Sequence, residues 1–553
     1  MRIRICIRHR AVQCLALTGS VVIGLALAIR PAASQGQPAG GAAVPASVGA
    51  ALPMLPPAAA CGSLRTLRLP DVRITEVVDA RDSVQQREAL RLRDNVRGPH
   101  CRVTGVTGKA ILFVVVLPDQ WNQRLYMGGN GGFAGTLARA ALANANAGYV
   151  SVTTNTGHEN GPDDGGARWA LNDPERQLDY GHVAVHRTVE VAKVIAKAYY
   201  GAEPKYSYFV GCSNGGRQGL MEAQRYPDDF DGIVAGAPAG PNSRIAGSFL
   251  KNIQATFPDP KAFDRPLVTQ ANLDLVSAAV LEACDAMDGV KDGVLDDARQ
   301  CQFKLATIKS CPAKRPGHDC LTAAQRAAIV RVYAPHTDTS GKVLYPGQPF
   351  GGENLAGGWP AWITGSDTGL MRRMKLPNAQ VMFASEGGKY LFASDSTWDY
   401  STYDLSNWAR DSRHASTFLN ADNPDITKFA ARNGKLLLWH GWADPAINAL
   451  GTIEYYEAVR ARDPKAADYL RLTMLPGVLH CAGGNGPAQV PWLRAISDWV
   501  ERGQAPEQLI ATKRDTTGKV VRTRPVCAFP QRAVYKGEGS TDDAANFSCR
   551  MPG

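Results

Sequence analysis

The chain has 553 residues, of which 44% are hydrophobic and 20% are charged, and it contains 55 Gly, 35 Pro and 12 Cys. This apolar content is typical of a globular protein and excludes a disordered tail or a collagen-like rod. The formal net charge is +10, but five arginines before residue 35 meet no acidic residue and leave +10 − 5 = +5 for the remainder. No Lys/Arg-dense stretch with interleaved aromatic residues occurs in the sequence, which argues against nucleic acid as a partner.

The first 34 residues have the pattern of a secretory signal peptide. Four arginines between residues 2 and 10 precede an apolar segment over residues 11–28, and Ala32, Ala33 and Ser34 offer small residues for cleavage. An N-terminal membrane anchor is the alternative. No later segment has about 18 uninterrupted apolar residues, so we expect no membrane contact after signal removal. Residues 35–60 carry no charge and are rich in Ala, Pro and Gly, which predicts a flexible leader.

Ten cysteines follow the predicted signal peptide. An even number of cysteines in an exported chain favours disulfides over free thiols. Zinc binding is not supported, because no C-x-x-C pair occurs. We therefore expect a secreted or periplasmic protein with disulfide bonds.

The first half of the chain alternates β-branched runs with helical periodicity. Expected strands cover residues 110–117, 124–127, 149–154, 206–210 and 233–234, and expected helices cover residues 178–200 and 217–226. Alternation of this kind predicts an α/β fold, with a mostly parallel sheet and helices on both faces.

This alternation stops between about residues 241 and 430, where Gly, Pro, Trp and short cysteine spacings dominate. Scattered helices are expected there, for example over residues 271–283 and 323–333. The alternation resumes with strands at 435–439 and 469–475 and with helices at 451–461 and 490–502. We therefore expect one core, made of residues 61–240 and 431–553, that is interrupted by a long insertion over residues 241–430.

The five residues from Gly211 to Gly215 match G-x-S-x-G and lie between an expected strand and an expected helix. That context is the one a nucleophile elbow requires, because its strained turn needs small neighbours. Ser213 is then the candidate nucleophile, above a helix N-terminus whose N–H groups favour developing negative charge. The alternative is an ordinary glycine-rich turn between a strand and a helix.

A serine nucleophile needs a base and an orienting carboxylate, which follow it in this fold in the order acid, then His. Asp444 and His480 each come shortly after an expected strand, at the sheet edge where sites of this class lie. The alternatives are a turn aspartate before a proline and a loop histidine. Other histidines are less suitable, because they lie within an expected helix, in the insertion or at a strand end (His182, His186, His336, His414 and His440).

Two cysteines lie directly beside these candidates. Cys212 precedes Ser213, and Cys481 follows His480. If the serine and the histidine are within hydrogen-bond reach, their neighbours are close to the Cα spacing of about 4.4–6.8 Å that a disulfide spans. This coincidence is the most specific local signal in the sequence.

Four motifs together resemble the tannase and feruloyl esterase family. They are GCSNGGR at 211–217, DGIVAGAP at 231–238, HGWAD at 440–444 and HC at 480–481. The resemblance extends from about residue 60 to the C-terminus. It implies an α/β-hydrolase fold with a large lid, here residues 241–430, and a serine esterase that hydrolyses esters of aromatic carboxylic acids.

The resemblance also assigns roles to individual residues. Ser213 is the implied nucleophile, His480 the base and Asp444 its orienting acid. The implied oxyanion hole is the backbone N–H of Asn214 with one from the glycine-rich loop after an expected strand, at Gly132. The implied disulfides are Cys212–Cys481, Cys284–Cys301, Cys311–Cys320, Cys61–Cys101 and Cys527–Cys549.

A short acidic loop carries Asp285, Asp288 and Asp292 together with two glycines. Carboxylates are hard oxygen donors that suit Ca²⁺, although the spacing is not that of an EF-hand. A solvated acidic turn is the alternative. The resemblance implies a structural calcium ion in the lid, held by these three side chains and by the carbonyls of Val290 and Val294.

Aromatic residues of the insertion are candidates for a platform beneath a planar acyl group. Phe350, Trp359 and Trp362 lie in a glycine-rich stretch, where packing in the lid core is the alternative for each. We choose Trp362 as the substrate-binding residue.

The branch of the family that hydrolyses terephthalate monoesters carries a Glu after the nucleophile and an Arg in the lid. Here Asn214 replaces the Glu, and residues 380–392 contain no Arg. This departure argues against terephthalate monoesters as the main substrate.

The expected function is therefore a feruloyl esterase-like hydrolase of small aromatic esters or of esters in plant polysaccharide or tannin. The alternatives are a tannin acyl hydrolase that cleaves gallate esters and a hydrolase of synthetic aromatic esters such as terephthalate monoesters. An inactive hydrolase-fold binding protein is the alternative outside enzymes, although such scaffolds usually lack a member of the triad.

Overall fold

The computed structural model describes residues 52–552, except 82, 86–87, 89–90, 92–93, 161–165, 313–316, 318 and 366–374. The predicted signal peptide and most of the predicted leader lie outside the described residues. None of the helices in the described part of the chain is long and apolar enough to cross a membrane.

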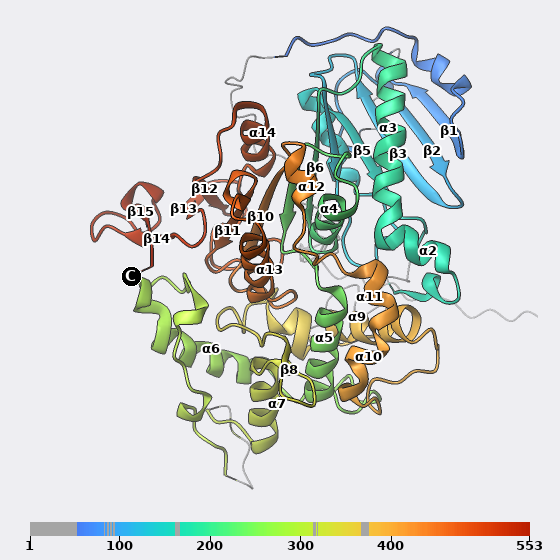
Figure 1. Ribbon diagram of the computed structural model, residues 1–553. Coiled ribbons are helices and arrows are strands. Elements are labelled where there is room, and N and C mark those ends of the chain that lie inside the picture. The colour runs from blue at the N-terminus through green and yellow to red at the C-terminus, as the bar shows by residue number, and fades with distance from the viewer. Residues whose placement is uncertain are drawn as a thin grey trace, which may run out of the picture.

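A twisted sheet runs through the core, and its strands follow the order β1-β2-β3-β5-β4-β6-β7-β10-β11 (Figure 1). These strands are β1 (Val72–Asp79), β2 (His100–Thr107), β3 (Ile111–Pro118), β4 (Arg124–Gly128), β5 (Val150–Thr154), β6 (Tyr206–Cys212), β7 (Gly232–Gly236), β10 (Lys435–Gly441) and β11 (Leu470–Leu475). The pairs β1–β2, β2–β3 and β3–β5 are antiparallel, and all pairs from β5 to β11 are parallel. The predicted mostly parallel sheet is therefore confirmed.

Alternate side chains of the central strands face two separate helical layers. On one face, Phe209 and Ile233 pack in a cluster with α3 (Ala184–Tyr200), α4 (Asn214–Arg225) and α13 (Ala449–Arg462). On the other face, Tyr208 and Val234 pack with α14 (Trp492–Arg502). The 3₁₀ segment η2 (Arg139–Ala147) packs against Val114 and Val116 of β3. This strand order with helices on both faces is that of an α/β-hydrolase, as expected.

The helix expected over residues 178–200 is divided in the structure. A short helix α2 (Pro174–Leu178) is followed by a π-helical turn η4 (Asp179–Val183), after which α3 begins. Asp173 caps α2 by accepting from the Arg176 N–H. The π-turn widens the backbone where its carbonyls accept hydrogen bonds from a buried side chain of α4, which the apolar periodicity of the sequence does not reveal.

Between β7 and β10 the chain forms a mainly helical layer at the carboxyl ends of the strands (Figure 1). Its helices are α5 (Asn242–Thr256), α6 (Gln270–Cys284), α7 (Ala323–Tyr333), α9 (Ala379–Gly387), α10 (Trp408–Asp411), α11 (Arg413–Leu419) and α12 (Thr427–Ala431), with a hairpin of β8 (His336–Thr337) and β9 (Val343–Tyr345). The layer has apolar clusters of its own around α6 and α7 and around α5 and α9. We call residues 241–430 the lid.

Two small hairpins complete the chain after α14. They are formed by β12 (Gln508–Arg514) with β13 (Val520–Cys527), and by β14 (Arg532–Tyr535) with β15 (Phe547–Arg550). Short 3₁₀ or π segments occur at η1 (Cys61–Thr66), η3 (Arg168–Ala170), η5 (Asp285–Asp288), η6 (Ala298–Gln300), η7 (Leu305–Thr307), η8 (Pro360–Thr364), η9 (Gly388–Phe392), η10 (Leu405–Asn407), η11 (Ala466–Asp468) and η12 (Ala544–Asn546).

The five implied disulfides are all present, with Cα–Cα distances between 4.9 and 5.9 Å. Four of them close segments of 40 residues or fewer, whereas Cys212–Cys481 joins positions 269 residues apart. That one bridge connects the two halves of the core on either side of the lid.

Candidate active site

Ser213 lies on a sharp turn between β6 and α4. Its backbone has φ 65° and ψ −123°, a conformation that a residue with a side chain rarely adopts. The turn is tied to the end of β7, because the Ser213 N–H donates to the Gly236 carbonyl at 3.0 Å and the Ser213 carbonyl accepts from the Ala239 N–H at 3.1 Å. The predicted strand–turn–helix geometry is therefore present, with the serine at the start of α4.

Glycines permit this turn by letting three backbone segments touch. A Cβ on Gly211 would lie 2.5 Å from the Gly215 carbonyl carbon, and a Cβ on Gly129 would lie 2.7 Å from the Gly215 Cα. Any larger residue at these positions would separate β4, β6 and α4. The sequence pattern G-x-S-x-G thus reflects a steric requirement of the elbow.

Asp444 and His480 meet at the carboxyl ends of β10 and β11. His480 Nδ1 lies 2.8 Å from Asp444 Oδ2, and both side chains are almost fully buried. Asp444 Oδ1 accepts the backbone N–H groups of Ala446 at 2.8 Å and Ile447 at 3.0 Å. The carboxylate is therefore held by its own loop, and it fixes the orientation of the imidazole.

His440 supports the same carboxylate from behind. Its Nε2 lies 3.2 Å from Asp444 Oδ2 and 2.8 Å from the Ile447 carbonyl, while its Nδ1 lies 2.8 Å from Thr452 Oγ1. Burial opposes ionisation of Asp444, but the two imidazoles outweigh it and hold the pKa of this carboxyl well below its usual range. Asp444 is therefore an anion throughout the neutral range.

The bridge between Cys212 and Cys481 places the loop of His480 beside Ser213. Its Cα atoms lie 5.9 Å apart, and Cys481 Sγ lies 3.7 Å from His480 Nε2. In the part of the chain that the structure describes, the Ser213 hydroxyl makes no hydrogen bond to the imidazole. Hydrogen bonds between a candidate nucleophile and its base are often long without substrate, so this absence does not exclude the pair.

The loop that carries His480 is also held from its other side. Lys513 Nζ on β12 donates to the carbonyls of Gly484 at 3.1 Å and Asn485 at 2.9 Å. Asn485 Nδ2 in turn donates to the Gly293 carbonyl at 3.3 Å, in the acidic loop of the lid. The position of His480 therefore depends on the core, the C-terminal hairpin and the lid together.

Gly132 and Asn214, the candidate oxyanion donors, lie on two segments that meet at the elbow. Asn214 is the first residue of α4, so its N–H belongs to the turn in which helix donors lack intrahelical partners. Gly132 follows β4 with a φ of 56°, in the loop that packs against the elbow through Gly129. The structure thus brings together both segments that the sequence nominated.

Aromatic side chains of the lid cover this site. Trp362 stands edge-to-face on the His480 ring, with centroids 4.9 Å apart, and stacks parallel to Phe383 at 6.0 Å. Phe383 packs against Phe133 at 5.0 Å, and its ring edge lies 3.5 Å from a Cβ built on Gly132. Trp362, Phe383 and Phe133 therefore form a continuous aromatic wall from the histidine to the oxyanion loop.

Two of the candidate lid aromatics lie elsewhere. Phe350 and Trp359 pack against Tyr333 at 4.8 Å and 5.0 Å, inside the apolar cluster around α6 and α7. Phe383 and Phe133 were not predicted from the sequence, because they come from different segments and only Phe133 adjoins a recognised motif.

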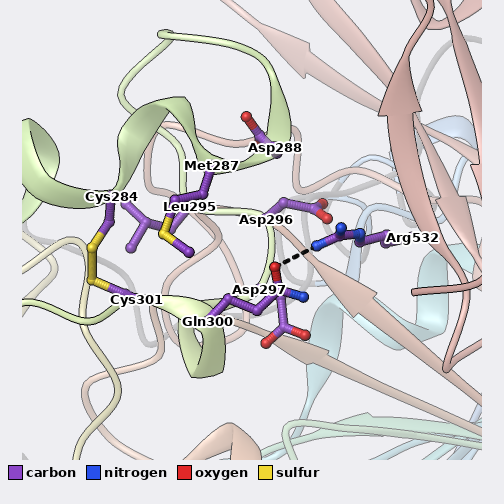
Figure 2. A pocket seen from close by; sticks show the side chains of 9 residues that line it. All are labelled: Cys284, Met287, Asp288, Leu295, Asp296, Asp297, Gln300, Cys301 and Arg532. Atoms are coloured by element: carbon purple, nitrogen blue, oxygen red, sulfur yellow. Dashed lines mark hydrogen bonds between the residues drawn. A yellow bond between two sulfur atoms is a disulfide. The ribbon is translucent and has the colours of Figure 1, made fainter. Parts of the chain in front are cut away.

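The acidic loop after α6 lines a small pocket together with Arg532 of β14 (Figure 2). Asp288 and Asp296 line it, and burial raises the pKa of Asp288 to about 6 and that of Asp296 to about 7. Asp296 Oδ2 and Asp292 Oδ1 are buried without a hydrogen-bond partner, so the donor chemistry suits a bound cation. Asp292 Oδ2, however, pairs with Arg524 at 2.8 Å.

Among the residues that the structure describes, no three His, Cys, Asp or Glu side chains converge closely enough to hold a metal ion as they stand. The backbone does bring the predicted ligands into one loop, in which Asp285 accepts from the Gly293 N–H at 3.0 Å and Asp288 from the Val290 N–H at 2.9 Å. Asp296 is a further buried carboxylate, outside the predicted ligand set.

Comparisons with known proteins show the family to which this chain is similar. Residues 95–550 match the family described as tannase and feruloyl esterase. The chain is 33% identical to mono(2-hydroxyethyl) terephthalate hydrolase of Piscinibacter sakaiensis over 86% of this chain and 87% of the relative. It is 31% identical to feruloyl esterase B of Aspergillus niger, over 78% of this chain and 82% of the relative. The crystal structure of feruloyl esterase B from Aspergillus oryzae superposes with a TM-score of 0.76 at 26% identity, over 89% of this chain and 99% of that chain.

Proposed function

We propose that this chain, which belongs to the tannase and feruloyl esterase family and is a carboxylic ester hydrolase, cleaves esters of aromatic carboxylic acids with Ser213 as nucleophile. The observation that carries the proposal is the covalent link between Cys212 and Cys481. It ties the elbow that presents Ser213 to the loop that presents His480, which Asp444 orients at 2.8 Å.

The reaction then follows from the arrangement of these groups. His480 Nε2 takes the proton of Ser213 Oγ as the oxygen attacks the ester carbonyl carbon, and the Nδ1–H remains bonded to Asp444. The N–H groups of Asn214 and Gly132 bind the oxyanion that forms. His480 gives its proton to the leaving alcohol, and an acyl-enzyme results. A water molecule, deprotonated by His480, attacks the acyl-enzyme and releases the acid.

The aromatic wall supports an aromatic acyl group. Trp362 and Phe383 are parallel and half-buried, so a planar ring can stack on them while its ester group reaches His480. We propose phenolic acids of the feruloyl type as the acyl group. Gallate esters are the second candidate, because a gallate ring is also planar and can stack on the same aromatic wall beside the elbow. A terephthalate monoester carries a free carboxylate, and Asn214 offers that group no positive charge.

A hydrolysis panel tests this choice. Methyl ferulate, methyl caffeate, methyl p-coumarate, methyl gallate and mono(2-hydroxyethyl) terephthalate are compared by kcat/KM, with methyl acetate as the non-aromatic control. We expect the phenolic esters to exceed the terephthalate monoester and the acetate by tenfold or more, roughly the 1.4 kcal/mol of one good aromatic contact. A preference for the terephthalate monoester would show that the proposed substrate class is wrong. If none of the esters is hydrolysed, the alternative of an inactive binding protein is favoured.

Calcium and export belong to the same proposal. A structural Ca²⁺ would be held by Asp285, Asp288 and Asp292 with the carbonyls of Val290 and Val294, and it would neutralise carboxylates buried in one loop. Export by the N-terminal signal is supported by the five disulfides, which form in oxidising compartments. Mass spectrometry of the protein from the culture medium or periplasm, showing loss of about the first 34 residues, would establish the export.

A further inference from the structure

The two segments that would bind the oxyanion are joined by one buried network of side chains. Arg217 lies one turn after Asn214 on α4, and its Nε donates to Asn214 Oδ1 at 2.8 Å. Asn214 Nδ2 donates to the Asn130 carbonyl at 3.3 Å, in the loop of Gly132. The Asn214 side chain is therefore held between Arg217 and the oxyanion loop.

Arg217 is fully buried, and its guanidinium binds backbone carbonyls. It donates to Tyr180 at 2.9 Å and Gly181 at 2.7 Å in the π-turn, and to Leu419 at 3.3 Å at the end of α11 in the lid. Across the described ranges of the chain, no carboxylate forms an ion pair with Arg217. Burial of a charge without an ionic partner is costly, although carbonyls at helix ends carry partial negative charge. Packing alone would not require such a group here.

Tyr180 extends this network to the second oxyanion segment. Its ring lies under the Arg217 guanidinium at 4.9 Å, and its hydroxyl donates to the Gly132 carbonyl at 3.0 Å. This hydrogen bond acts on the peptide that follows Gly132, whereas the Gly132 N–H belongs to the peptide before it. Gly132 has a positive φ, and a glycine can rotate about its own backbone bonds unless the peptide after it is held. The Tyr180 side chain, which is 4% exposed, provides that hold from the π-turn.

The next two carbonyls of the loop are held in the same way. His158 Nε2 donates to the Phe133 carbonyl at 2.9 Å, and Asn160 Nδ2 donates to the Ala134 carbonyl at 2.6 Å. Within each planar peptide the N–H points opposite to the C=O. The N–H groups opposite the Phe133 and Ala134 carbonyls are those of Ala134 and Gly135, which donate to the Gly131 and Asn155 carbonyls, each at 3.0 Å. The Gly131 carbonyl shares its peptide with the Gly132 N–H, so this network also fixes the direction of that donor.

We propose that Tyr180 and Arg217 are positioning residues for oxyanion stabilisation, with Arg217 holding the Asn214 side chain against the oxyanion loop and the Tyr180 hydroxyl fixing the peptide that follows Gly132. The inference rests on the proposed function, because it takes Gly132 and Asn214 as the oxyanion donors. The π-turn has a role in this account, since it presents two carbonyls to Arg217 and the phenol to Gly132 at once.

Tyr180→Phe removes one oxygen atom and leaves the ring in place. Loss of an oxyanion donor itself costs about 10²–10³ in kcat, so loss of its support should lower kcat about tenfold with KM changed less than about twofold. The affinity for an aryl boronic acid, which forms a tetrahedral adduct with the serine, should fall with kcat. The affinity for the aromatic acid product should not change.

Tyr400→Phe is the matched control. Tyr400 is 3% exposed, and its hydroxyl donates to the Phe257 carbonyl at 2.8 Å within the lid, away from the elbow. We expect this variant to keep the parent kcat. If Tyr180→Phe does not fold, Arg217→Lys gives the same test, because one ammonium cannot bridge Asn214 and the π-turn as the guanidinium fork does.

Two outcomes separate this inference from the proposed function. If Ser213→Ala is inactive but Tyr180→Phe keeps the parent kcat and boronate affinity, or loses no more than Tyr400→Phe, the positioning role is wrong and the triad stands. If Ser213→Ala keeps activity, the proposed function is wrong whatever Tyr180→Phe does. A fall in kcat and in boronate affinity for Tyr180→Phe alone supports the inference.

Discussion

The core half and the lid half of the active site are held in different ways. Around Ser213 the backbone packs directly on backbone, since Gly129, Gly211 and Gly215 leave no space for a side chain. The lid instead contributes side chains, and Trp362 and Phe383 touch the site through their rings only. We therefore expect the elbow around Ser213 to tolerate few substitutions. The lid side chains, which we expect to select the ester, should tolerate substitution at a small cost in stability.

The largest expected effect is at the nucleophile. Ser213→Ala should lower the turnover of a phenolic ester by roughly 10⁴- to 10⁶-fold while leaving the protein folded, because the triad acts as a unit. Ser207→Ala, near the start of β6 and buried away from the elbow, is the control that should keep parent turnover. Full activity in purified Ser213→Ala would overturn the role of the elbow.

The bridge between the two halves of the core comes next. Closing 269 residues would stabilise the fold by roughly 5–6 kcal/mol in the chain-entropy model, but a core of this size does not need that help. We expect Cys212→Ala with Cys481→Ala to lower turnover per folded molecule about 100-fold, since a misplacement of about 1 Å at a catalytic pair has that effect.

Turnover per folded molecule is measured with the folded fraction taken from circular dichroism at the assay temperature. Cys311→Ala with Cys320→Ala is the control, because it removes a disulfide of the lid that spans 9 residues and lies outside the site. A Cys212/Cys481 double variant that turns over like the parent, or free thiols at both positions in the parent, would contradict the geometric role.

The lid should affect selectivity more than rate. Phe383→Leu removes a ring that stacks on Trp362 but keeps an apolar side chain. We expect kcat/KM for methyl ferulate to fall about tenfold and that for methyl acetate to fall less than twofold, so the ratio between the two esters reports the change. Equal losses on both esters would place Phe383 in the support of the chemistry rather than in acyl binding.

The smallest expected effect on catalysis is that of calcium. A chelator should lower the melting temperature by several degrees through loss of a ligand of the native state, with turnover of the folded protein changed only a few-fold. Added Ca²⁺ should restore the melting temperature, and Asp288→Asn should abolish the restoration. An unchanged melting curve in chelator, with no calcium found in the untreated protein, would contradict the site.

The parts of the site that could be predicted are those that depend on contacts between residues close in the sequence. The elbow is local, because glycine spacing around Ser213 follows from backbone contact within a few residues. Cys212 and Cys481 were informative since each adjoins a candidate catalytic residue. The mostly parallel direction of the strands followed from their alternation with helices, whereas their order in the sheet was not predicted.

The parts that could not be predicted depend on segments distant in the chain. Phe133 and Phe383 are in contact although 250 positions separate them in the sequence, and no periodicity in either segment predicts the contact. The π-turn that carries Tyr180 was hidden within one helical pattern, and its carbonyls bind the side chain of Arg217 on another helix, which is 37 positions away from Tyr180. Trp359 and Trp362 lie in the same glycine-rich stretch of the sequence. The structure distinguishes them, because Trp359 packs against Tyr333 and Trp362 against His480.

The most direct test of the central claim is to locate the acylated residue. The protein is treated with an aryl phosphonate that reacts with activated serines, digested and examined by peptide mass spectrometry, with residual esterase activity measured on the same samples. We predict one adduct per molecule, on Ser213, that rises in step with the loss of activity and is absent in Ser213→Ala. An adduct on another residue, or hydrolysis that persists after Ser213 is fully modified, would contradict the account.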